Sequence, residues 1–182
     1  MSVHPLRTTV AALAIALVPA GAALAATALK IPFSSVNAEG IDKAIGSVTA
    51  IDTPDGLRLT PALRGLPPGE HGFHVHEKPS CEALPDAAQG GKMTPALGAG
   101  GHLDPDKTAR HEGPDGNGHK GDLPSLTVGA NGKATKAVVA KHLKVADLRD
   151  HALMIHAGGD NYADQPAPLG GGGGRIACGV AR

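Results

Sequence analysis

Apolar and β-branched residues recur along the chain in short runs with a period near two, which is typical of strands rather than helices. Such runs occupy residues 44–51, 57–63, 71–76, 125–128, 133–140, 151–156 and 175–180. Helical periodicity is poor, and only residues 145–150 suit a turn or two of helix. Many short strands separated by turn residues predict an all-β fold, a sandwich or a barrel.

Two dipeptides mark tight turns between these runs. Asp55-Gly56 separates residues 44–51 from 57–63, and Asn131-Gly132 separates residues 125–128 from 133–140. Both pairs suit the positive φ angles of a two-residue hairpin turn. We therefore expect two β-hairpins.

Three long segments interrupt the strand pattern. Residues 77–101 and 103–121 are rich in Gly, Pro, Asp and Lys, and histidines border or interrupt both. Loops of this length in a small domain are usually functional or disordered, and the histidines favour function. The third segment, 157–174, ends in five glycines. It lacks the Gly-Lys-Ser/Thr ending of a phosphate-binding loop, so it is not one. We expect instead a flexible backbone that brings Arg175 to a place where side chains would crowd.

The first 25 residues have the pattern of an export signal. Residues 10–20 are apolar but too short to span a bilayer, and Ala23-Leu24-Ala25 suits signal peptidase. We expect cleavage after Ala25, which leaves residues 26–182 as a single domain and no transmembrane segment in the mature chain. A retained membrane anchor is the alternative, but no stop-transfer pattern follows.

Charge and aromatic content exclude a nucleic-acid-binding function. Arg7 is the only charged residue among 1–25, so residues 26–182 keep 16 Lys and Arg against 17 Asp and Glu. This near balance contains no basic block, and only 2% of residues are aromatic. Neither phosphate binding nor base stacking has a basis here.

The two cysteines, Cys81 and Cys178, have two interpretations. An even number of cysteines in an exported chain favours a disulfide, because the compartment is oxidising. Two cysteine metal ligands are the alternative, but neither residue belongs to a C-x-x-C pair or adjoins a histidine.

Histidine is over-represented, and its spacing indicates metal binding. His74 and His76 alternate on a predicted strand, so both imidazoles face one side while Val75 faces the other. Two neutral imidazoles on one face supply half of a copper or zinc site. His156, at the end of another predicted strand, completes this site if the two strands meet.

A second set of potential ligands follows within the second loop. His119 and Asp122, three residues apart, can fold around one ion and offer nitrogen and oxygen to zinc. His102 and His111 can supply the two further ligands that four-coordinate zinc requires.

Four sequence stretches resemble Cu/Zn superoxide dismutases of the bacterial exported type. They are Gly72-Phe73-His74-Val75-His76-Glu77, Gly100-Gly101-His102-Leu103-Asp104-Pro105, Gly118-His119-Lys120-Gly121-Asp122-Leu123-Pro124, and residues 170–174 followed by Arg175-Ile176-Ala177-Cys178-Gly179. The likeness covers most of residues 31–182 in the expected order. It implies a Greek-key β-sandwich or barrel of about eight antiparallel strands with long metal-binding loops.

The resemblance also implies roles for individual residues, with one copper and one zinc ion per subunit. The copper ligands would be His74, His76, His102 and His156. The zinc ligands would be His102, His111, His119 and Asp122. His102 would be shared between the metals, and Asp160 would link a histidine of each site from outside. Arg175 would guide the superoxide anion, and Cys81 and Cys178 would form the family disulfide.

The implied reaction oxidises one superoxide to dioxygen and reduces a second to hydrogen peroxide at copper. His102 and Arg175 would take part, His102 by leaving copper upon reduction and accepting a proton. The chain would be periplasmic or otherwise exported and would protect the cell envelope, and a homodimer is compatible with the sequence. A non-enzymatic metal carrier and a zinc hydrolase are rival hypotheses. The carrier predicts the loss of a ligand or of Arg175, and the hydrolase needs an open zinc position.

Overall fold

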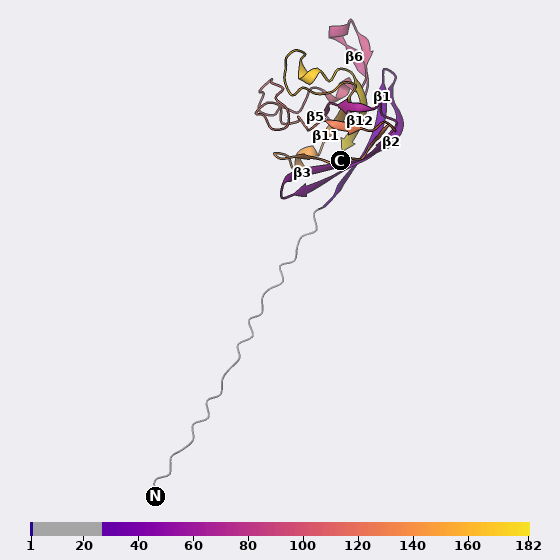
Figure 1. Ribbon diagram of the computed structural model, residues 1–182. Helices are drawn as coiled ribbons and strands as arrows, with labels where there is room; N and C mark the ends of the chain where they lie inside the picture. Colours follow the sequence, from indigo (N-terminus) through magenta and orange to yellow (C-terminus); the bar gives the residue numbers. More distant parts are fainter. Residues whose placement is uncertain (2–26) are drawn as a thin grey trace.

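The computed structural model describes Met1 and residues 27–182 (Figure 1). The predicted leader, residues 1–25 with cleavage after Ala25, lies outside the described residues except for Met1. Among the helices of the described part, none has the length and apolar character needed to cross a membrane.

Eight antiparallel strands form one curled sheet (Figure 1). Its strands are β1 (Leu29–Asn37), β2 (Gly40–Thr53), β3 (Gly56–Arg64), β5 (Phe73–His76), β9 (Lys133–Ala134), β10 (Val138–Ala140), β11 (His151–His156) and β12 (Arg175–Ala181). They lie in the order β10-β3-β2-β1-β12-β11-β5, and β9 also pairs with β3. The all-β prediction is therefore confirmed.

Smaller elements complete the fold. Two further strand pairs join β4 (Gly69–His71) to β8 (Leu126–Val128), and β6 (Leu84–Asp86) to β7 (Lys92–Thr94). The only helices of residues 27–182 are single 3₁₀ turns, η1 (Ala87–Gln89), η2 (Leu97–Ala99), η3 (Val145–Leu148) and η4 (Leu169–Gly171). The third of these matches the short helical turn expected at residues 145–150.

The connections between strands follow a Greek-key path. Strands β1, β2 and β3 are neighbours in both sequence and space, but the chain then crosses from β3 to β5 at the other end of the sheet. After β10 pairs with β3, the chain crosses back and places β11 beside β5. The last strand, β12, lies between β1 and β11, so the first and the last strands of the chain pair with each other.

The first predicted hairpin is confirmed, and the second is only partly so. Strands β2 and β3 pair from Thr53–Gly56 onward, so the two turn residues are Pro54 and Asp55, one position earlier than predicted, and Gly56 with φ +124° begins β3. At Asn131-Gly132 a turn forms, with the Gly129 amide donating to Lys133 O (2.9 Å). However, β8 then pairs with β4 and β9 pairs with β3. This turn connects the separate β4–β8 pair to the eight-stranded sheet instead of forming a two-stranded hairpin.

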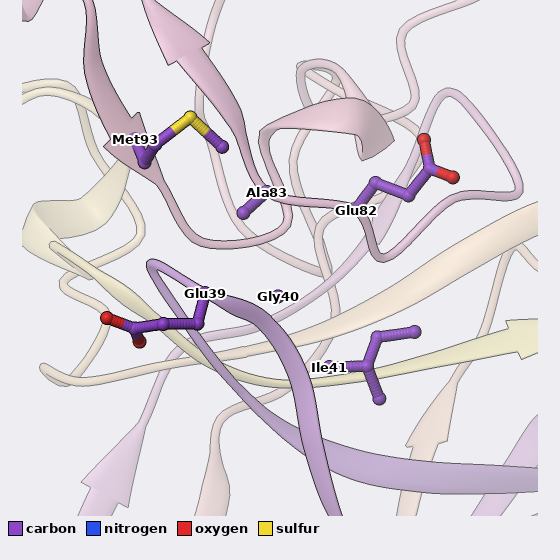
Figure 2. Close-up of a pocket in the computed structure, with 6 residues that line it drawn as sticks. All are labelled: Glu39, Gly40, Ile41, Glu82, Ala83 and Met93. Atoms are coloured by element: carbon purple, nitrogen blue, oxygen red, sulfur yellow. The ribbon is translucent and has the colours of Figure 1, made fainter.

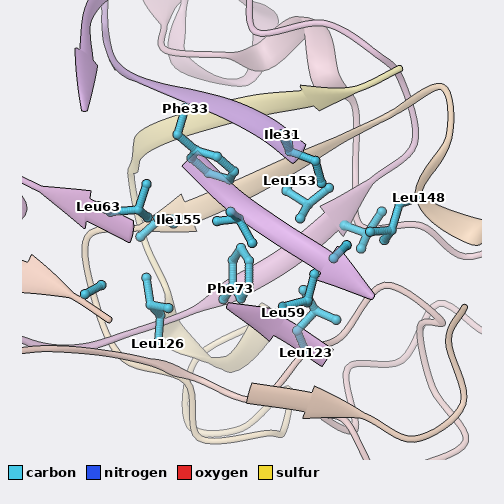
Figure 3. Close-up of a cluster of buried hydrophobic side chains, with 14 of the residues drawn as sticks. Ile31, Phe33, Leu59, Leu63, Phe73, Leu123, Leu126, Leu148, Leu153 and Ile155 are labelled. Atoms are coloured by element: carbon cyan, nitrogen blue, oxygen red, sulfur yellow. The ribbon is translucent and has the colours of Figure 1, made fainter. Parts of the chain in front are cut away.

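Hydrophobic residues on the concave side of the sheet form the main core, which Figure 3 shows in close-up. Phe33, Phe73, Leu153 and Ile155 are each at most 1% exposed. Val75 is fully buried in the same cluster. Because side chains alternate along a strand, the residues before and after Val75 project to the outer side of β5. This agrees with the expectation that Val75 and the H-x-H imidazoles face opposite layers.

A smaller hydrophobic cluster on the other face contains the disulfide. Cys81 and Cys178 are bonded, with Cα atoms 5.8 Å apart, and neither cysteine is free. The sulfur atoms pack in a cluster that includes Ala96, Ala99 and Met154. The predicted disulfide is thus confirmed, and it fastens the first long loop to strand β12.

We expect loss of this disulfide to lower the free energy of unfolding by about 4–5 kcal/mol. Closing a loop of 97 residues restricts the unfolded chain, and the chain-entropy relation gives this magnitude. Urea unfolding of the metal-free protein, with and without a reductant, measures the difference. The double variant Cys81→Ser/Cys178→Ser should match the reduced protein, and equal unfolding midpoints for oxidised and reduced samples would contradict the expectation.

Candidate metal centre

All of the histidines and the aspartate assigned to metals by sequence are buried, and they gather beside β5. His74 and His76 come from β5 itself, and His156 comes from the end of β11, which pairs with β5. The other four lie in the loop between residues 101 and 123: His102, His111, His119 and Asp122. Their exposed fractions range from 0 to 9%.

The second long loop is held against the free edge of β5 by backbone pairing. Val75 accepts one hydrogen bond from the loop (2.8 Å) and donates another to it (2.9 Å). Isolated bridges then place His76 beside His102 and His74 beside Asp122. The loop therefore behaves locally like an added strand, which explains how residues far apart in sequence converge.

The first set of potential ligands, which we call the four-histidine group, comprises His74, His76, His102 and His156. Each offers one ring nitrogen, and the four nitrogens lie within 4.8 Å of one another. Buried nitrogens without a hydrogen-bond partner are uncommon in proteins, yet each of the four rings has one. The unpartnered atoms are His74 Nδ1, His76 Nε2, His102 Nε2 and His156 Nε2.

The opposite nitrogens of three of these rings are fixed by the protein. His76 Nδ1 lies 3.0 Å from the Gly100 carbonyl oxygen, and His156 Nδ1 lies 3.1 Å from that of Gly173. His74 Nε2 lies 2.7 Å from Asp160 Oδ2. Since a carbonyl or carboxylate oxygen accepts, each of these ring nitrogens donates and the other nitrogen keeps its lone pair for a metal.

A second set, the Asp122 group, consists of Asp122 with His102, His111 and His119. The Nδ1 atoms of His102 and His111 each lie 3.0 Å from a carboxylate oxygen of Asp122, and that of His119 lies 3.5 Å away. Ligands 2.0–2.1 Å from a tetrahedral zinc ion are about 3.3–3.4 Å apart. His111 Nδ1 and His119 Nδ1 make no aligned hydrogen bond despite this proximity. These separations suit a shared ion.

An alternative grouping contains His74 instead of His119, again within 4.8 Å. His74 has only one free nitrogen, because Asp160 holds the other, and that free nitrogen belongs to the four-histidine group. We therefore place His119 in the Asp122 group. His102 belongs to both groups, with Nδ1 toward Asp122 and Nε2 free.

Asp160 connects the two groups from outside. Its Oδ2 accepts from His74 and its Oδ1 accepts from His111 Nε2 (2.8 Å) and from the Tyr162 amide (2.8 Å). Burial raises the pKa of Asp160, but the hydrogen bonds from His111 and His74 outweigh it and hold the pKa far below its usual range. The carboxylate is therefore ionised and fixes the ring orientation of one histidine in each group.

Burial keeps most of the four-histidine group neutral in the metal-free protein. It lowers the pKa of His76 well below 6.5, and the charges of His102 and Arg175 add to this effect. It also lowers the pKa of His102 to about 4, despite the hydrogen bond to Asp122, and that of His156 to about 3. Neutral imidazoles are the form that binds metals.

The Asp122 group has the opposite electrostatic character. Burial alone would lower the pKa of His111, but the carboxylates of Asp122 and Asp160 raise it to about 9. Burial likewise raises the pKa of Asp122, yet the hydrogen bond from His102 and the nearby ring of His111, whose Nδ1 lies 3.0 Å from Oδ2, hold it far below the usual value. Two ionised carboxylates thus favour a positive charge here, either a proton on His111 or a metal cation.

Arg175 lies at the start of β12, where its guanidinium group is held by backbone carbonyls. It donates to Ala96 O (2.5 Å) and Gly100 O (2.6 Å). Burial lowers its pKa, but an arginine side chain stays charged at any working pH. Its charge also lowers the pKa of His76 and His156, which places it electrostatically beside the four-histidine group.

Close contacts favour glycine at two positions of the run before Arg175. Gly170 has φ +71°, and a Cβ atom there would collide with the Asp160 carboxylate and with His111. Gly172 lies against His156, where a Cβ atom would approach the His156 side chain to 3.2 Å. The expected crowding is therefore present at these two positions, but a Cβ atom at Gly174, next to Arg175, would meet nothing within 4 Å.

Several functional contacts had no signal in the sequence. The Gly100 carbonyl, shared by His76 and Arg175, is a backbone atom that no motif marks. The Tyr162 hydroxyl accepts from the Ser125 amide (2.9 Å) and so ties the third loop to the chain after Asp122. Lys120 forms an ion pair with Asp147 (2.7 Å), so its charge is neutralised locally.

A surface hollow lies apart from both groups (Figure 2). It is lined by residues of the β1–β2 turn, of the start of β2 and of the first long loop: Glu39, Gly40, Ile41, Glu82, Ala83 and Met93. None of these belongs to the four-histidine group or the Asp122 group.

Comparison with known proteins agrees with this geometry. The family described as "Copper/zinc superoxide dismutase (SODC)" matches residues 44–181. The chain is 54% identical to superoxide dismutase [Cu-Zn] of Escherichia coli (strain K12) over 169 residues, 92% of this chain and 95% of the relative.

Two solved structures have the same fold. The Cu/Zn superoxide dismutase from Brucella abortus superimposes with a TM-score of 0.82 at 47% identity, covering 86% of this chain and all of that one. The monomeric copper, zinc superoxide dismutase from Salmonella enterica gives a TM-score of 0.77 at 50% identity with the same coverage. The chain therefore belongs to the copper/zinc superoxide dismutase family of oxidoreductases, which use both copper and zinc.

Proposed function

We propose that the four-histidine group holds copper, that the Asp122 group holds zinc, and that superoxide is dismutated to dioxygen and hydrogen peroxide at the copper position. The observation that carries this assignment is the set of unpartnered buried nitrogens, one on each of the six histidine rings. Neutral imidazoles suit copper, and a nitrogen-rich set with one carboxylate suits zinc. Both groups fit the metals that the family uses.

When bound, copper supplies a one-electron acceptor for one superoxide and a one-electron donor for the next. The residues of the chain prepare the site for this chemistry. His102 offers Nδ1 to the zinc side and Nε2 to the copper side, so the same ring can hold a proton on Nε2 when that atom is not a ligand. Arg175 adds a permanent positive charge beside the four-histidine group, which attracts an anionic substrate.

Asp160 is proposed to link the ring orientations of one histidine in each site. It holds a ring nitrogen of His74 on the copper side and one of His111 on the zinc side. Outer carboxylates of this kind fix the tautomer of a ligand histidine and raise its basicity. Because one carboxylate holds both rings, a movement of the His74 ring is resisted by the His111 ring, and the reverse.

The carrier and hydrolase hypotheses have less support. No potential ligand is missing from the four-histidine group, and Arg175 is held in place, as a dismutase requires. The Asp122 group offers four ligand atoms to a metal, whereas a zinc hydrolase has three protein ligands and leaves the fourth position open for water.

The cellular context is also a proposal. We propose that residues 1–25 are removed as a signal peptide, that residues 26–182 form the mature domain, and that the protein acts in the periplasm or is otherwise exported. The disulfide between Cys81 and Cys178 supports this, because such bonds persist in oxidising compartments. There the enzyme would protect the cell envelope. A homodimer stays a prediction, and the Salmonella enterica relative is described as monomeric.

Substitution of single ligands should remove one metal selectively. We expect His156→Ala to lose copper and retain zinc, whereas His119→Ala should lose zinc, falling from about one ion per chain to less than about half. Elemental analysis of the purified variants measures both contents. The exposed His142 lies outside both groups, so His142→Ala should keep both metals. Full zinc content in His119→Ala would refute its assignment and favour His74.

Arg175→Ala should slow dismutation about tenfold while copper and zinc contents stay unchanged, since electrostatic guidance contributes at least this much. Arg175→Lys should retain part of the rate, because the charge remains but the two-pronged donor geometry does not. Pulse radiolysis at several ionic strengths measures the rates. Salt should slow the wild type more than the alanine variant. A wild-type rate in Arg175→Ala would exclude the guiding role.

The metal-free protein should lose stability as the pH falls from 7 to 5. His102 and His156 have folded-state pKa values of about 4 and 3, so the unfolded chain binds more protons in this range. Each should cost about 2 kcal/mol of unfolding free energy. His111 acts in the opposite direction, since its raised pKa of about 9 stabilises the fold at lower pH, but by less over this interval. Urea midpoints that do not change between pH 7 and 5 would contradict this balance.

A further inference from the structure

Glu77 lies one residue after β5, and its carboxylate is fixed on the backbone of the first long loop. Glu77 Oε2 accepts a hydrogen bond from the Gly101 amide (3.1 Å), and the Glu77 amide donates to the Gly101 carbonyl (3.1 Å). The side-chain carboxylate and the backbone amide of Glu77 therefore hold the amide and the carbonyl oxygen of Gly101, the two polar backbone groups of that residue. Gly100 has φ +76°, and a Cβ atom there would collide with this carboxylate.

The turn that Glu77 holds carries an acceptor shared by two functional side chains. Gly100 O accepts from Arg175 Nη2 (2.6 Å) and lies 3.0 Å from His76 Nδ1, which donates to it. The residue that follows Gly101 is His102, whose backbone pairs with that of His76. A displacement of this turn would therefore move the guanidinium group and two rings of the four-histidine group together.

We propose that Glu77 is a positioning residue for the reaction: its carboxylate fixes the Gly100–Gly101 turn, and through the Gly100 carbonyl it sets the place of Arg175 and of His76. This inference rests on the proposed function, in which Arg175 guides superoxide and His76 binds copper. Glu77 does not touch the substrate. Small displacements of groups that orient a reactant can change a rate without any loss of binding residues.

Two variants separate the hydrogen bond of Glu77 from its charge. Glu77→Ala removes both, whereas Glu77→Gln keeps an amide oxygen that can accept from Gly101. Because the Glu77 side chain is exposed and outside the core, both variants should fold. Glu39→Ala is the matched control, since Glu39 is an exposed glutamate on the β1–β2 turn.

We expect Glu77→Ala to lower the dismutation rate about two- to tenfold at unchanged copper and zinc content, the range that one hydrogen bond can supply. Glu77→Gln should retain most of the rate, and Glu39→Ala all of it. In an Arg175→Ala background, Glu77→Ala should have a smaller effect, because the group through which Glu77 acts is gone. A Glu77→Ala rate equal to or above that of the wild type, or equal rates for Glu77→Ala and Glu77→Gln, would overturn the proposal.

Two spectroscopic readouts test the positioning itself. The Cu(II) electron paramagnetic resonance spectrum should change in Glu77→Ala and be largely restored in Glu77→Gln, since the Gly100 carbonyl to which His76 donates is displaced in the first variant and held in place in the second. In the diamagnetic Cu(I),Zn protein, the Gly101 amide should exchange with solvent faster in Glu77→Ala. Unchanged spectra and exchange would overturn the proposal. A wild-type protein that binds both metals without dismutating superoxide would refute the proposed function, while these two readouts would still decide the role of Glu77.

Discussion

Four of the buried imidazoles use one nitrogen for a hydrogen bond to the protein and leave the other without one, and the arrangement of the centre depends on this division. His74 and His111 are held by Asp160, His76 by Gly100 O and His156 by Gly173 O. Because a neutral ring has one donor and one acceptor nitrogen, each hydrogen bond also decides which atom keeps a free lone pair. The second nitrogen of each ring then has no protein partner. Loss of an outer acceptor would therefore disturb the tautomer as well as the position of a ring.

Strand β5 supplies the mechanical basis for this arrangement. Phe73 and Val75 are packed in the core, while His74 and His76 between and beside them face the loops. The hydrophobic contacts on one face therefore fix the directions of the imidazoles on the other, since a shift by one residue would exchange the two faces. The same strand accepts the second long loop on its free edge. The centre thus rests on a strand at its base and is covered by loops that carry the remaining potential ligands.

Sequence patterns predicted what depends on local periodicity and on spacing. The ranges 57–63, 151–156 and 175–180 agree closely with β3, β11 and β12 because turn residues bound them. Strand β1 was not predicted, although Ile31 and Phe33 alternate toward the core, because Pro32 and two serines weaken the pattern. The partners of β8 and β9 depend on barrel closure, which no local signal encodes.

The ligand residues could be nominated from their order and from resemblance, since histidine spacing is visible in one dimension. Which nitrogen of each ring is free could not, because the acceptors at Gly100 and Gly173 are backbone carbonyls in distant loops. The link from Glu77 to Arg175 was hidden for the same reason. Sequence patterns report side-chain types, so the role of a backbone carbonyl or amide is known only when the tertiary contacts are known.

The central place of the last strand has a consequence for how the chain is made. β12 lies between β1 and β11 and carries both Cys178 and Arg175. A nascent chain that does not yet extend beyond β11 lacks this strand, so β1 and β11 keep open edges and neither the disulfide nor the guanidinium contact exists. The sheet can close only after synthesis reaches residue 181. The edges of β1 and β11 therefore stay open to other pairings until the last strand has been made, and closure of the sheet is a late step of folding.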